Sequence, residues 1–496
     1  MPLKPCVLAI DQGTTSSRSM LFDEGGNPIA SAQREFKQHY PAAGWVEHSP
    51  HDIVNTVVET AREMLAHADE NGYRVAAIGV TNQRETTIVW DRKTGEPIYN
   101  AIVWQDRRTA DRCAQLRDSG AQSDVVERTG LLVDPYFSAS KISWILDNVS
   151  GARARAKRGE LAFGTVDSYL IYHLTGGAKR VTDATNASRT SVFNITRQTW
   201  DDELLRLFDV PGLLLPDVLD CIDDFGMASS KVLGEAIPIF GVAGDQQAAA
   251  IGQGCFEVGD VKSTYGTGCF VLSNTGTKKL TSKNKMLSTI AYRLSGKTTY
   301  ALEGSIFIAG AGVQWLRDEL QLVERASETE ALARGLENNG GVYLVPAFTG
   351  LGAPHWDPDA RGAIFGLTRG SGKAHIARAT LESVCYQTND LLDAMQDDGV
   401  PMRSLKIDGG MVANNWLAQF LTDIVNLPIT RAKVAETTAL GAARLAGYKA
   451  GVYDTIAAPE SNVEASNRFD PAMHADLRRD LLAGWQNAVE RTLTSK

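Results

Sequence analysis

At 496 residues the chain exceeds what one hydrophobic core usually supports, so two or three domains are expected. Its 43% hydrophobic and 22% charged content is ordinary for a soluble globular protein. The formal net charge of -9 argues against a general affinity for nucleic acid, which requires a basic surface. No apolar run approaches the roughly 20 residues that span a bilayer, so membrane insertion is not expected either.

The cysteines predict neither a metal site nor a disulfide framework, because no C-x-x-C pair occurs among them. We interpret them as free thiols in a reducing compartment. The N-terminus has only a short apolar run, which breaks at Asp11 and Gln12 without a cleavage-site pattern. These features predict a cytoplasmic protein. The six thiols are Cys6, Cys113, Cys221, Cys255, Cys269 and Cys385.

The first elements in chain order are predicted to form an antiparallel meander. A buried-type strand over 6–10 is followed by a second strand that includes Leu21 and Phe22. The polar turn 24–28 then leads to a third extended piece that starts at Ile29. Strands alternating with short polar turns are typical of such a meander.

A helix and a buried strand are predicted next. Ser49 can cap the helix and Pro50 suits its first position, while the Asn-Gly pair at 71–72 ends it. The run VAAIGV over 75–80 predicts a parallel strand, which leads into the polar loop 81–86.

The second half repeats this arrangement. A predicted strand over 261–265 ends in Gly-Thr-Gly, and another over 405–407 ends in Asp408-Gly409-Gly410 before a helix from about Asn414. The pattern of an apolar strand, Asp and a Gly-rich turn thus occurs at Asp11 and again at Asp408. We expect two related α/β halves that face one cleft, with the boundary near 251–256.

Two common nucleotide-binding motifs are absent. Gly370–Lys373 resembles the end of a P-loop, but Leu367 replaces its first Gly and Ala374 replaces the Ser/Thr. We therefore interpret it as a surface turn. The segment 310–315 does not complete a G-x-G-x-x-G fingerprint either.

Two other segments are candidate phosphate cradles. In 11–18, a tight turn at Gly13 can direct backbone N–H groups inward, and hydroxyls and a guanidinium add further donors. Asp11 at the strand end could hold a hydrated Mg²⁺. The segment 264–268 has the same chemistry. Each segment alone is equally compatible with an ordinary Ser/Thr-rich hairpin turn.

The order of these turns resembles the bipartite nucleotide site of the actin, Hsp70 and sugar-kinase superfamily. Five further segments resemble the FGGY family of carbohydrate kinases, collinearly from Val7 to about Tyr448. Three of them are similar to the glycerol kinases of that family rather than to its pentose kinases. The two family signatures lie at 136–148 and 362–382, and the three glycerol-kinase-like segments at 81–86, 244–247 and 265–270.

The resemblance implies an α/β fold with two ribonuclease-H-like domains, 1–252 and 253–496, that flank a central cleft. It implies ATP-dependent phosphorylation of glycerol to sn-glycerol 3-phosphate in glycerol catabolism, with ATP and Mg²⁺ as cofactors and a homodimer or homotetramer as the assembly. The implied nucleotide-binding residues are Thr14, Thr15, Ser16, Arg18, Thr267, Gly310, Gln314, Gly410, Met411 and Asn415, and the implied metal ligands are Asp11 and Asp245.

The chemistry of alcohol phosphorylation supports this interpretation. The reaction needs a base near the hydroxyl, neutralisation of the phosphoryl charge and in-line positioning. Asp245, on a Gly-flanked turn after the apolar strand 237–242, can supply the catalytic base. A triol also needs paired polar groups and aromatic walls, although each aromatic alone is more typical of a core. By the resemblance, glycerol is bound by Arg84, Glu85, Trp104, Tyr136, Asp245, Gln246 and Phe270.

Two alternatives remain open. One is another FGGY kinase that acts on a pentulose, a gluconate or erythritol. The other is an actin- or Hsp70-like ATPase, which would share the phosphate turns but lack the polyol pocket. An inactive member of the family is disfavoured because Asp11 and Asp245 are both present.

Two controls that act on some bacterial glycerol kinases are expected to be absent, while control by another effector stays open. Some bacterial glycerol kinases bind fructose 1,6-bisphosphate through a Gly-rich loop that ends in Arg, and others are activated at a His of that loop. Here Ala236 stands in place of the Arg, beside Glu235, and Lys231 stands in place of the His.

Overall fold

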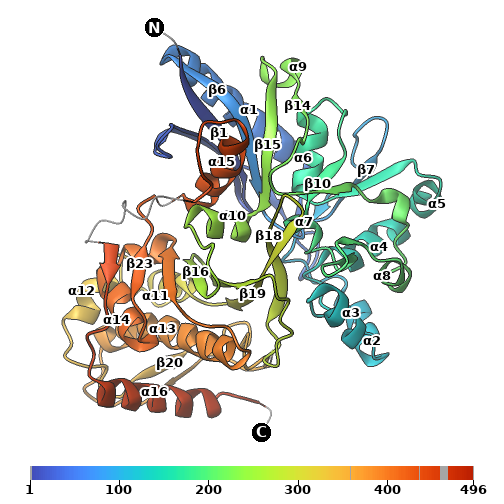
Figure 1. Ribbon diagram of the computed structural model, residues 1–496. Helices are drawn as coiled ribbons and strands as arrows, with labels where there is room; N and C mark the ends of the chain where they lie inside the picture. The colour runs from blue at the N-terminus through green and yellow to red at the C-terminus, as the bar shows by residue number, and fades with distance from the viewer. Residues whose placement is uncertain (1–2, 358, 435, 458–466, 495–496) are drawn as a thin grey trace.

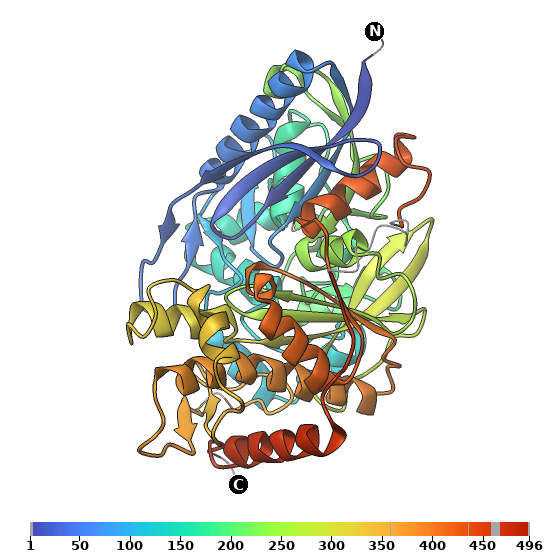
Figure 2. The ribbon, with the colours of Figure 1, turned by 90° about the vertical axis from the view of Figure 1, so that its left-hand side faces the viewer.

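The computed structural model describes residues 3–357, 359–434, 436–457 and 467–494. It consists of two α/β lobes, each built around a mixed sheet, which confirms the expected fold class (Figure 1 and Figure 2). The first sheet runs in the order β14 (Met227–Ala228), β15 (Ile237–Gly244), β6 (Tyr73–Asn82), β1 (Lys4–Gln12), β2 (Ser16–Phe22) and β3 (Pro28–Glu35).

The predicted meander is present in this sheet. Strand β1 pairs antiparallel with β2, which pairs antiparallel with β3, while β6 lies parallel to β1 and β15 parallel to β6. Asp11 aligns with Thr81, and Asn82 aligns with Gly244. The carboxyl ends of β1, β6 and β15 therefore lie at one edge of the sheet, which gathers Asp11, the loop after β6 and Asp245 there.

Helix α1 (Pro50–Glu70) covers this sheet and begins as predicted. The Ser49 hydroxyl accepts a hydrogen bond from the backbone N–H of Asp52, and Pro50 occupies the first turn. The other helices of the first lobe are α2 (Ala110–Asp118), α3 (Gln122–Thr129), α4 (Ser138–Asn148), α5 (Ala152–Lys157), α6 (Val166–Leu174), α7 (Ala184–Ala187), α8 (Asp202–Leu207), α9 (Ser230–Leu233) and α10 (Asp245–Gly252).

One small three-stranded sheet and three short strand pairs complete the first lobe. They are β4 (Gln38–His39), β5 (Glu47–His48) and β8 (Ala101–Ile102); β7 (Ile88–Asp91) and β9 (Leu161–Gly164); β10 (Val181–Asp183) and β13 (Asp217–Leu219); and β11 (Phe193–Asn194) and β12 (Thr199–Trp200).

The second sheet also contains the predicted strands. Its order is β18 (Leu287–Leu294), β19 (Lys297–Ile306), β17 (Cys269–Gly276), β16 (Asp260–Tyr265), β22 (Ser404–Asp408), β23 (Ile429–Arg431) and β24 (Arg468–Phe469). A separate pair consists of β20 (Tyr343–Val345) and β21 (Ala363–Phe365). The helices of this half are α11 (Gly310–Asp318), α12 (Glu328–Arg334), α13 (Lys373–Asp397), α14 (Asn415–Val425), α15 (Thr437–Lys449) and α16 (Ala475–Glu490).

One helix of the second half packs on the first lobe. In Figure 1, α15 lies beside β1 and β15 of the upper lobe, whereas α16 lies at the far edge of the lower lobe. The approach is close, because a Cβ atom added at Gly79 of β6 would lie 2.1 Å from the carbonyl oxygen of Ala442. The chain thus returns to its first lobe after forming most of its second.

Two smaller expectations are also met. All six cysteines are free and buried. Gly370 is exposed in a turn that the N–H of Ser371 closes by donating to the carbonyl of Thr368 at 3.0 Å, whereas Lys373, the last residue of the predicted turn, begins α13. Within the described ranges, no helix is both long and apolar enough to cross a membrane.

Candidate active site

The edge formed by β1, β6 and β15 brings together the first group of predicted site residues. Arg84 and Glu85 follow β6, and Asp245 follows β15. Asp245 is the first residue of helix α10, which corrects the expectation that it lies on a turn. Its Oδ1 atom accepts a hydrogen bond from the N–H of Gln246, 2.6 Å away, so the helix start fixes the carboxylate.

Arg84 connects this carboxylate to the second lobe. Its Nε atom lies 3.1 Å from Oδ1 of Asp245, and its Nη1 atom donates to Oε2 of Glu303 on β19 at 2.5 Å. Burial alone would lower the pKa of Arg84, but the Glu303 and Glu85 carboxylates raise it well above its usual value. Arg84 therefore remains a cation that bridges the two lobes.

Four buried charges of alternating sign form a closed ring. Arg189 donates from Nε to Glu85 at 2.6 Å and from Nη2 to Glu303 at 2.9 Å. Glu303 in turn binds Arg84, whose Nε atom is 3.9 Å from Oε1 of Glu85. All four side chains are 3% exposed or less. We call Arg84, Glu85, Arg189 and Glu303 the charge ring.

Three predicted aromatic residues stand beside the charge ring. The Trp104 ring lies edge-on to Tyr136 and Phe270, with ring centroids 5.6 and 6.3 Å apart. Phe270 comes from β17 of the second lobe, so both lobes contribute to this wall. Burial and the nearby Glu85 carboxylate raise the pKa of the Tyr136 hydroxyl, which therefore stays protonated. The wall combines apolar faces with one neutral donor.

Gln246 is bound from the opposite lobe. Its Oε1 atom accepts a hydrogen bond from the buried ammonium of Lys262 on β16. Burial lowers the pKa of Lys262, whereas Asp408 and Asp245 oppose this shift. Since Lys262 engages the amide oxygen, the amide N–H groups of Gln246 are the ones left to face a ligand.

The first candidate phosphate turn, 11–18, is closed by its own backbone. The N–H of Gly13 donates to the carbonyl of Ser16 at 2.9 Å. Thr14 accepts a hydrogen bond from Nε1 of Trp104 at 3.0 Å, which ties this turn to the aromatic wall. Thr15 at the tip is exposed. Arg18 lies further along β2, where it pairs with Gln33 and with Glu436, the residue before α15.

The second candidate phosphate turn, 264–268, is joined to the start of α11. The carbonyl of Thr267 accepts hydrogen bonds from the N–H groups of Ala309 and Ala311, each at 3.0 Å. A Cβ atom at Gly310 would lie 2.5 Å from the carbonyl oxygen of Gly266, so only glycine fits there without a backbone shift. Gln314 is exposed one turn further along this helix.

The Asp-Gly-Gly turn lies next to these two segments. Gly410 and Met411 form a short 3-10 turn after β22, and Met411 approaches Gly310. Asn415 begins α14, and its side-chain oxygen accepts a hydrogen bond from Arg431 at 2.8 Å. The second-lobe residues predicted for the nucleotide thus gather at the carboxyl ends of β16 and β22.

The acidic groups of this region fit a magnesium ion. Desolvation and the neighbouring Asp245 carboxylate raise the pKa of Asp11 to about 7. Oδ1 of Asp408 is buried and has no hydrogen-bond partner among the described residues. No group of three or more His, Cys, Asp or Glu side chains with metal-site geometry occurs in the described chain. The two predicted ligands, Asp11 and Asp245, would supply two carboxylates, and Mg²⁺ suits so few because it keeps several of its waters.

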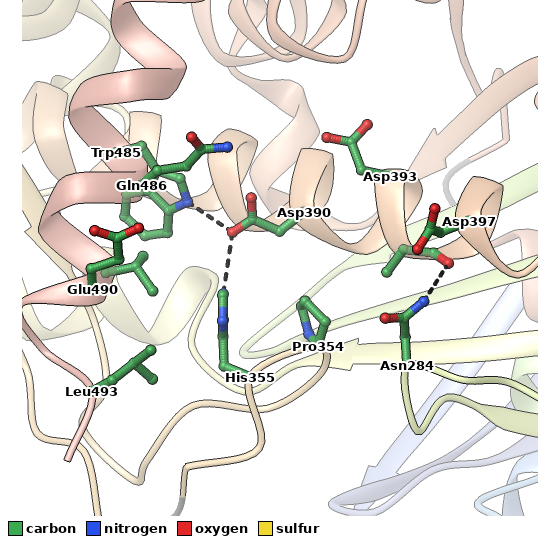
Figure 3. A pocket seen from close by; sticks show the side chains of 12 residues that line it. Asn284, Pro354, His355, Asp390, Asp393, Asp397, Trp485, Gln486, Glu490 and Leu493 are labelled. Atoms are coloured by element: carbon green, nitrogen blue, oxygen red, sulfur yellow. Dashed lines mark hydrogen bonds and ion pairs between the residues drawn. The ribbon is translucent and has the colours of Figure 1, made fainter. Parts of the chain in front are cut away.

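Two hollows elsewhere on the surface contain none of the predicted site residues. One, of about 440 Å³, opens between α13 and α16, where His355 and Trp485 both point at Asp390 (Figure 3). The other lies between α1 and α9 and includes Arg62 and Lys231.

Four charged residues of the site were not predicted from the sequence: Lys141, Arg189, Lys262 and Glu303. Lys141 is fully buried and donates to the backbone carbonyl of Tyr136 at 2.8 Å. Each of the four stands within or beside a buried segment, as Glu303 does in the run YALEGSIFIA. Such isolated charges need a partner, and this was the signal available in the sequence.

Family profiles match both halves of the chain. The N-terminal domain of the FGGY family of carbohydrate kinases matches residues 6–252, and the C-terminal domain matches residues 261–450. This chain belongs to the FGGY family of carbohydrate kinases. The two matched domains divide the chain in the same order as its two lobes.

Individual relatives are similar over nearly the whole chain. A protein named glycerol kinase from Rhodospirillum centenum is 62% identical over 489 residues, with 99% of this chain and 98% of that protein covered. Glycerol kinase 1 of Pseudomonas aeruginosa is 59% identical over 485 residues, with 98% of each covered. The crystal structure of Plasmodium falciparum glycerol kinase with ADP has a TM-score of 0.94 at 37% identity and 99% coverage of both chains.

A pentose kinase shares only the fold. A ligand-bound xylulose kinase from Lactobacillus acidophilus has a TM-score of 0.88 at 22% identity, with 99% of both chains covered.

Proposed function

We propose that this FGGY kinase transfers the γ-phosphoryl group of ATP to a terminal hydroxyl of glycerol, giving sn-glycerol 3-phosphate. The observation that carries the proposal is the 3.1 Å pair between Nε of Arg84 and Oδ1 of Asp245, next to the aromatic wall. A cation and a base fixed beside apolar rings suit a small triol. The similarity to proteins named glycerol kinase supports the same substrate.

In this proposal the polar side chains hold the hydroxyl groups. Glu85 uses Oε1 for Arg189, so Oε2 is left to accept from glycerol. Tyr136 and the amide of Gln246 can donate. Trp104 and Phe270 then cover the carbon edge and exclude water, which would otherwise compete for the phosphoryl group.

Asp245 would act as the general base. The N–H of Gln246 and Nε of Arg84 both engage Oδ1, which leaves Oδ2 to take the proton of the attacking hydroxyl. As that proton moves to Asp245, the hydroxyl oxygen bonds to the γ-phosphorus and ADP leaves.

The nucleotide would lie across the turns of both lobes. Thr14, Thr15, Ser16 and Thr267 would donate to phosphate oxygens, and Gly310, Gln314, Gly410, Met411 and Asn415 would contact the rest of ATP. For Arg18 to reach a phosphate, it has to leave its pair with Glu436. Asp11 and Asp245 would hold Mg²⁺, which when bound neutralises phosphate charge.

We further propose how the chain is organised and where it acts. We divide it into domains 1–252 and 253–496, with α15 reaching back onto the first, as its packing against β1, β6 and β15 supports. The six free thiols and the need for ATP favour the cytoplasm. A homodimer or homotetramer is the expected assembly, which light scattering on the purified protein will test.

A coupled ADP-release assay tests the function directly. Glycerol, D-xylulose, D-ribulose and erythritol are compared at equal concentration with Mg·ATP. We expect glycerol to be strongly preferred and sn-glycerol 3-phosphate to accumulate. A preference for either ketopentose would overturn the proposal, and ADP release without any polyol would favour an ATPase instead.

A further inference from the structure

We infer that Glu303 is a positioning residue of the second lobe that fixes Arg84 and, through Arg189, Glu85 in the polyol pocket. The inference rests on the proposed function, since it deepens the role of the same pocket. Glu303 is placed on β19, whereas Arg84, Glu85 and Arg189 all belong to the first lobe. The charge ring is therefore complete only where the two lobes meet.

The contacts of Glu303 take up both of its oxygens. Oε2 accepts from Nη1 of Arg84 at 2.5 Å, and Oε1 accepts from Nη2 of Arg84 at 3.2 Å and from Nη2 of Arg189 at 2.9 Å. The two-point contact sets the plane of the Arg84 guanidinium. That plane in turn places Nε against Asp245 at 3.1 Å.

The charge balance of the pocket depends on the Glu303 carboxylate. The ring holds two cations and two anions, and Glu303 is the anion that accepts hydrogen bonds from both cations, whereas Glu85 accepts one from Arg189 and lies 3.9 Å from Arg84. Burial alone would raise the pKa of Glu303, but Arg189 and Arg84 hold it at about 2. Without the charge of Glu303, the buried guanidiniums of Arg84 and Arg189 would have only Glu85 left in the ring. Both would then turn toward Glu85 or toward Asp245.

The position of Glu303 also connects the polyol pocket with the nucleotide turn. Strand β19 carries Glu303, pairs Ser305 with Phe270 of the aromatic wall, and ends at Ile306. Helix α11 with Gly310 begins four residues later. The same strand thus supports the charge ring, one wall of the pocket and the second phosphate turn.

A merely structural salt bridge between lobes would give a different kinetic signature from a positioning role. Weakening a structural bridge lowers thermal stability and affects both substrates alike. Loss of positioning raises KM for the polyol, leaves KM for ATP nearly unchanged and is non-additive with loss of Arg189.

The experiment compares four variants of the full chain: E303Q, R189Q, the double variant R189Q/E303Q and the control E382Q. Glu382 is a matched control because it is equally buried in the second lobe and accepts from Arg378 at 2.7 Å, away from the site. KM for glycerol and for ATP, kcat, and ADP affinity by calorimetry are measured for each, with thermal melts to compare folding.

We expect E303Q to raise KM for glycerol by about 10- to 100-fold, because the variant loses its charge-assisted contact with the Arg84 guanidinium. In E303Q, KM for ATP and the ADP affinity should change by less than about threefold. The control E382Q should match the wild type in KM for glycerol and in KM for ATP. The double variant should bind glycerol better than E303Q, because removing Arg189 restores the charge balance.

The proposal is overturned if E303Q keeps its glycerol KM within twofold of the wild type, if ATP and glycerol are affected equally, or if the two single effects simply add. Failure of the proposed function looks different. In that case the wild type itself does not phosphorylate glycerol, and the same variants are compared on the polyol that it does accept.

Discussion

Nε of Arg84 lies 3.1 Å from Oδ1 of Asp245, so a side chain proposed to bind glycerol also holds the proposed base. Asp245 is about a third exposed, whereas Arg84 is buried and fixed by Glu303. The Asp245 carboxylate is therefore accessible to a ligand, while the buried Arg84 guanidinium fixes its orientation. Substrate binding and base orientation thus depend on the same guanidinium.

Asp245→Asn should lower kcat while most glycerol binding remains. The carboxamide keeps the shape and can still pair through its oxygen with Arg84, but it cannot take a proton. Removal of a general base typically costs about 10²- to 10⁴-fold in rate. Steady-state kinetics with glycerol will measure this. A variant that keeps more than about half of the wild-type kcat would exclude Asp245 as the base, and Glu85 would be tested next.

Local patterns were sufficient to predict the frame of the site. Strand β1, its turn after Asp11 and the cap at Ser49 all depend on residues within a few positions of one another. Glu303 could not be placed in this way, because its partners Arg84 and Arg189 lie 219 and 114 residues away in sequence. The strand pattern predicts that a buried charge needs a partner but not which one it has.

Asp11 should make magnesium binding dependent on pH. Desolvation and the Asp245 carboxylate raise its pKa to about 7, so the carboxylate is mostly protonated at pH 6 and mostly ionised at pH 8. Since a metal ligand must be deprotonated, the half-saturating free Mg²⁺ for ADP binding should fall about tenfold between these values. Calorimetry of ADP binding over a series of free Mg²⁺ concentrations, repeated at pH 6 and pH 8, measures it.

The control for this titration is Asp11→Asn, which should bind Mg²⁺·ADP weakly and without this dependence on pH. A half-saturating Mg²⁺ concentration that is the same at pH 6 and pH 8 in the wild type would contradict the assignment of Asp11 as a metal ligand.

Gly79→Ala should destabilise the protein. The added Cβ would lie 2.1 Å from the carbonyl oxygen of Ala442, and α15 can move away only by losing its contacts with β6. Overpacking of this kind costs about 1–3 kcal/mol or more. Gly370→Ala is the control, because Gly370 lies on an exposed turn and its added Cβ would meet only Oγ1 of Thr368, at 3.8 Å. Urea unfolding of both variants measures the difference, and equal midpoints would show that α15 is not packed as described.

The docking of α15 shows what sequence patterns leave open. The strand and turn pattern indicates two halves, and the expected boundary near 251–256 follows from it. The pattern does not indicate that Thr437–Lys449 packs on the first sheet, because the contact depends on close backbone approach at Gly79 of β6 and at Gly241 of β15. Small residues permit such an approach without specifying the partner.

Fructose 1,6-bisphosphate at millimolar concentration should not inhibit the enzyme. The segment that would bind it has Ala236 in place of the expected Arg, and no Arg or His occurs from 223 to 242. The adjacent hollow does contain Arg62, Arg74 and Lys231, but Asp69 and Glu235 line it too. Nε of Arg62 already donates to the carbonyl of Val232 at 2.7 Å. Losing one charge-assisted phosphate contact costs roughly 1.5–3 kcal/mol, or one to two decades in affinity. Activity titrated with the bisphosphate should therefore stay flat. Dose-dependent inhibition that disappears in Lys231→Ala would mean that the basic residues of this hollow bind the phosphates despite the missing arginine.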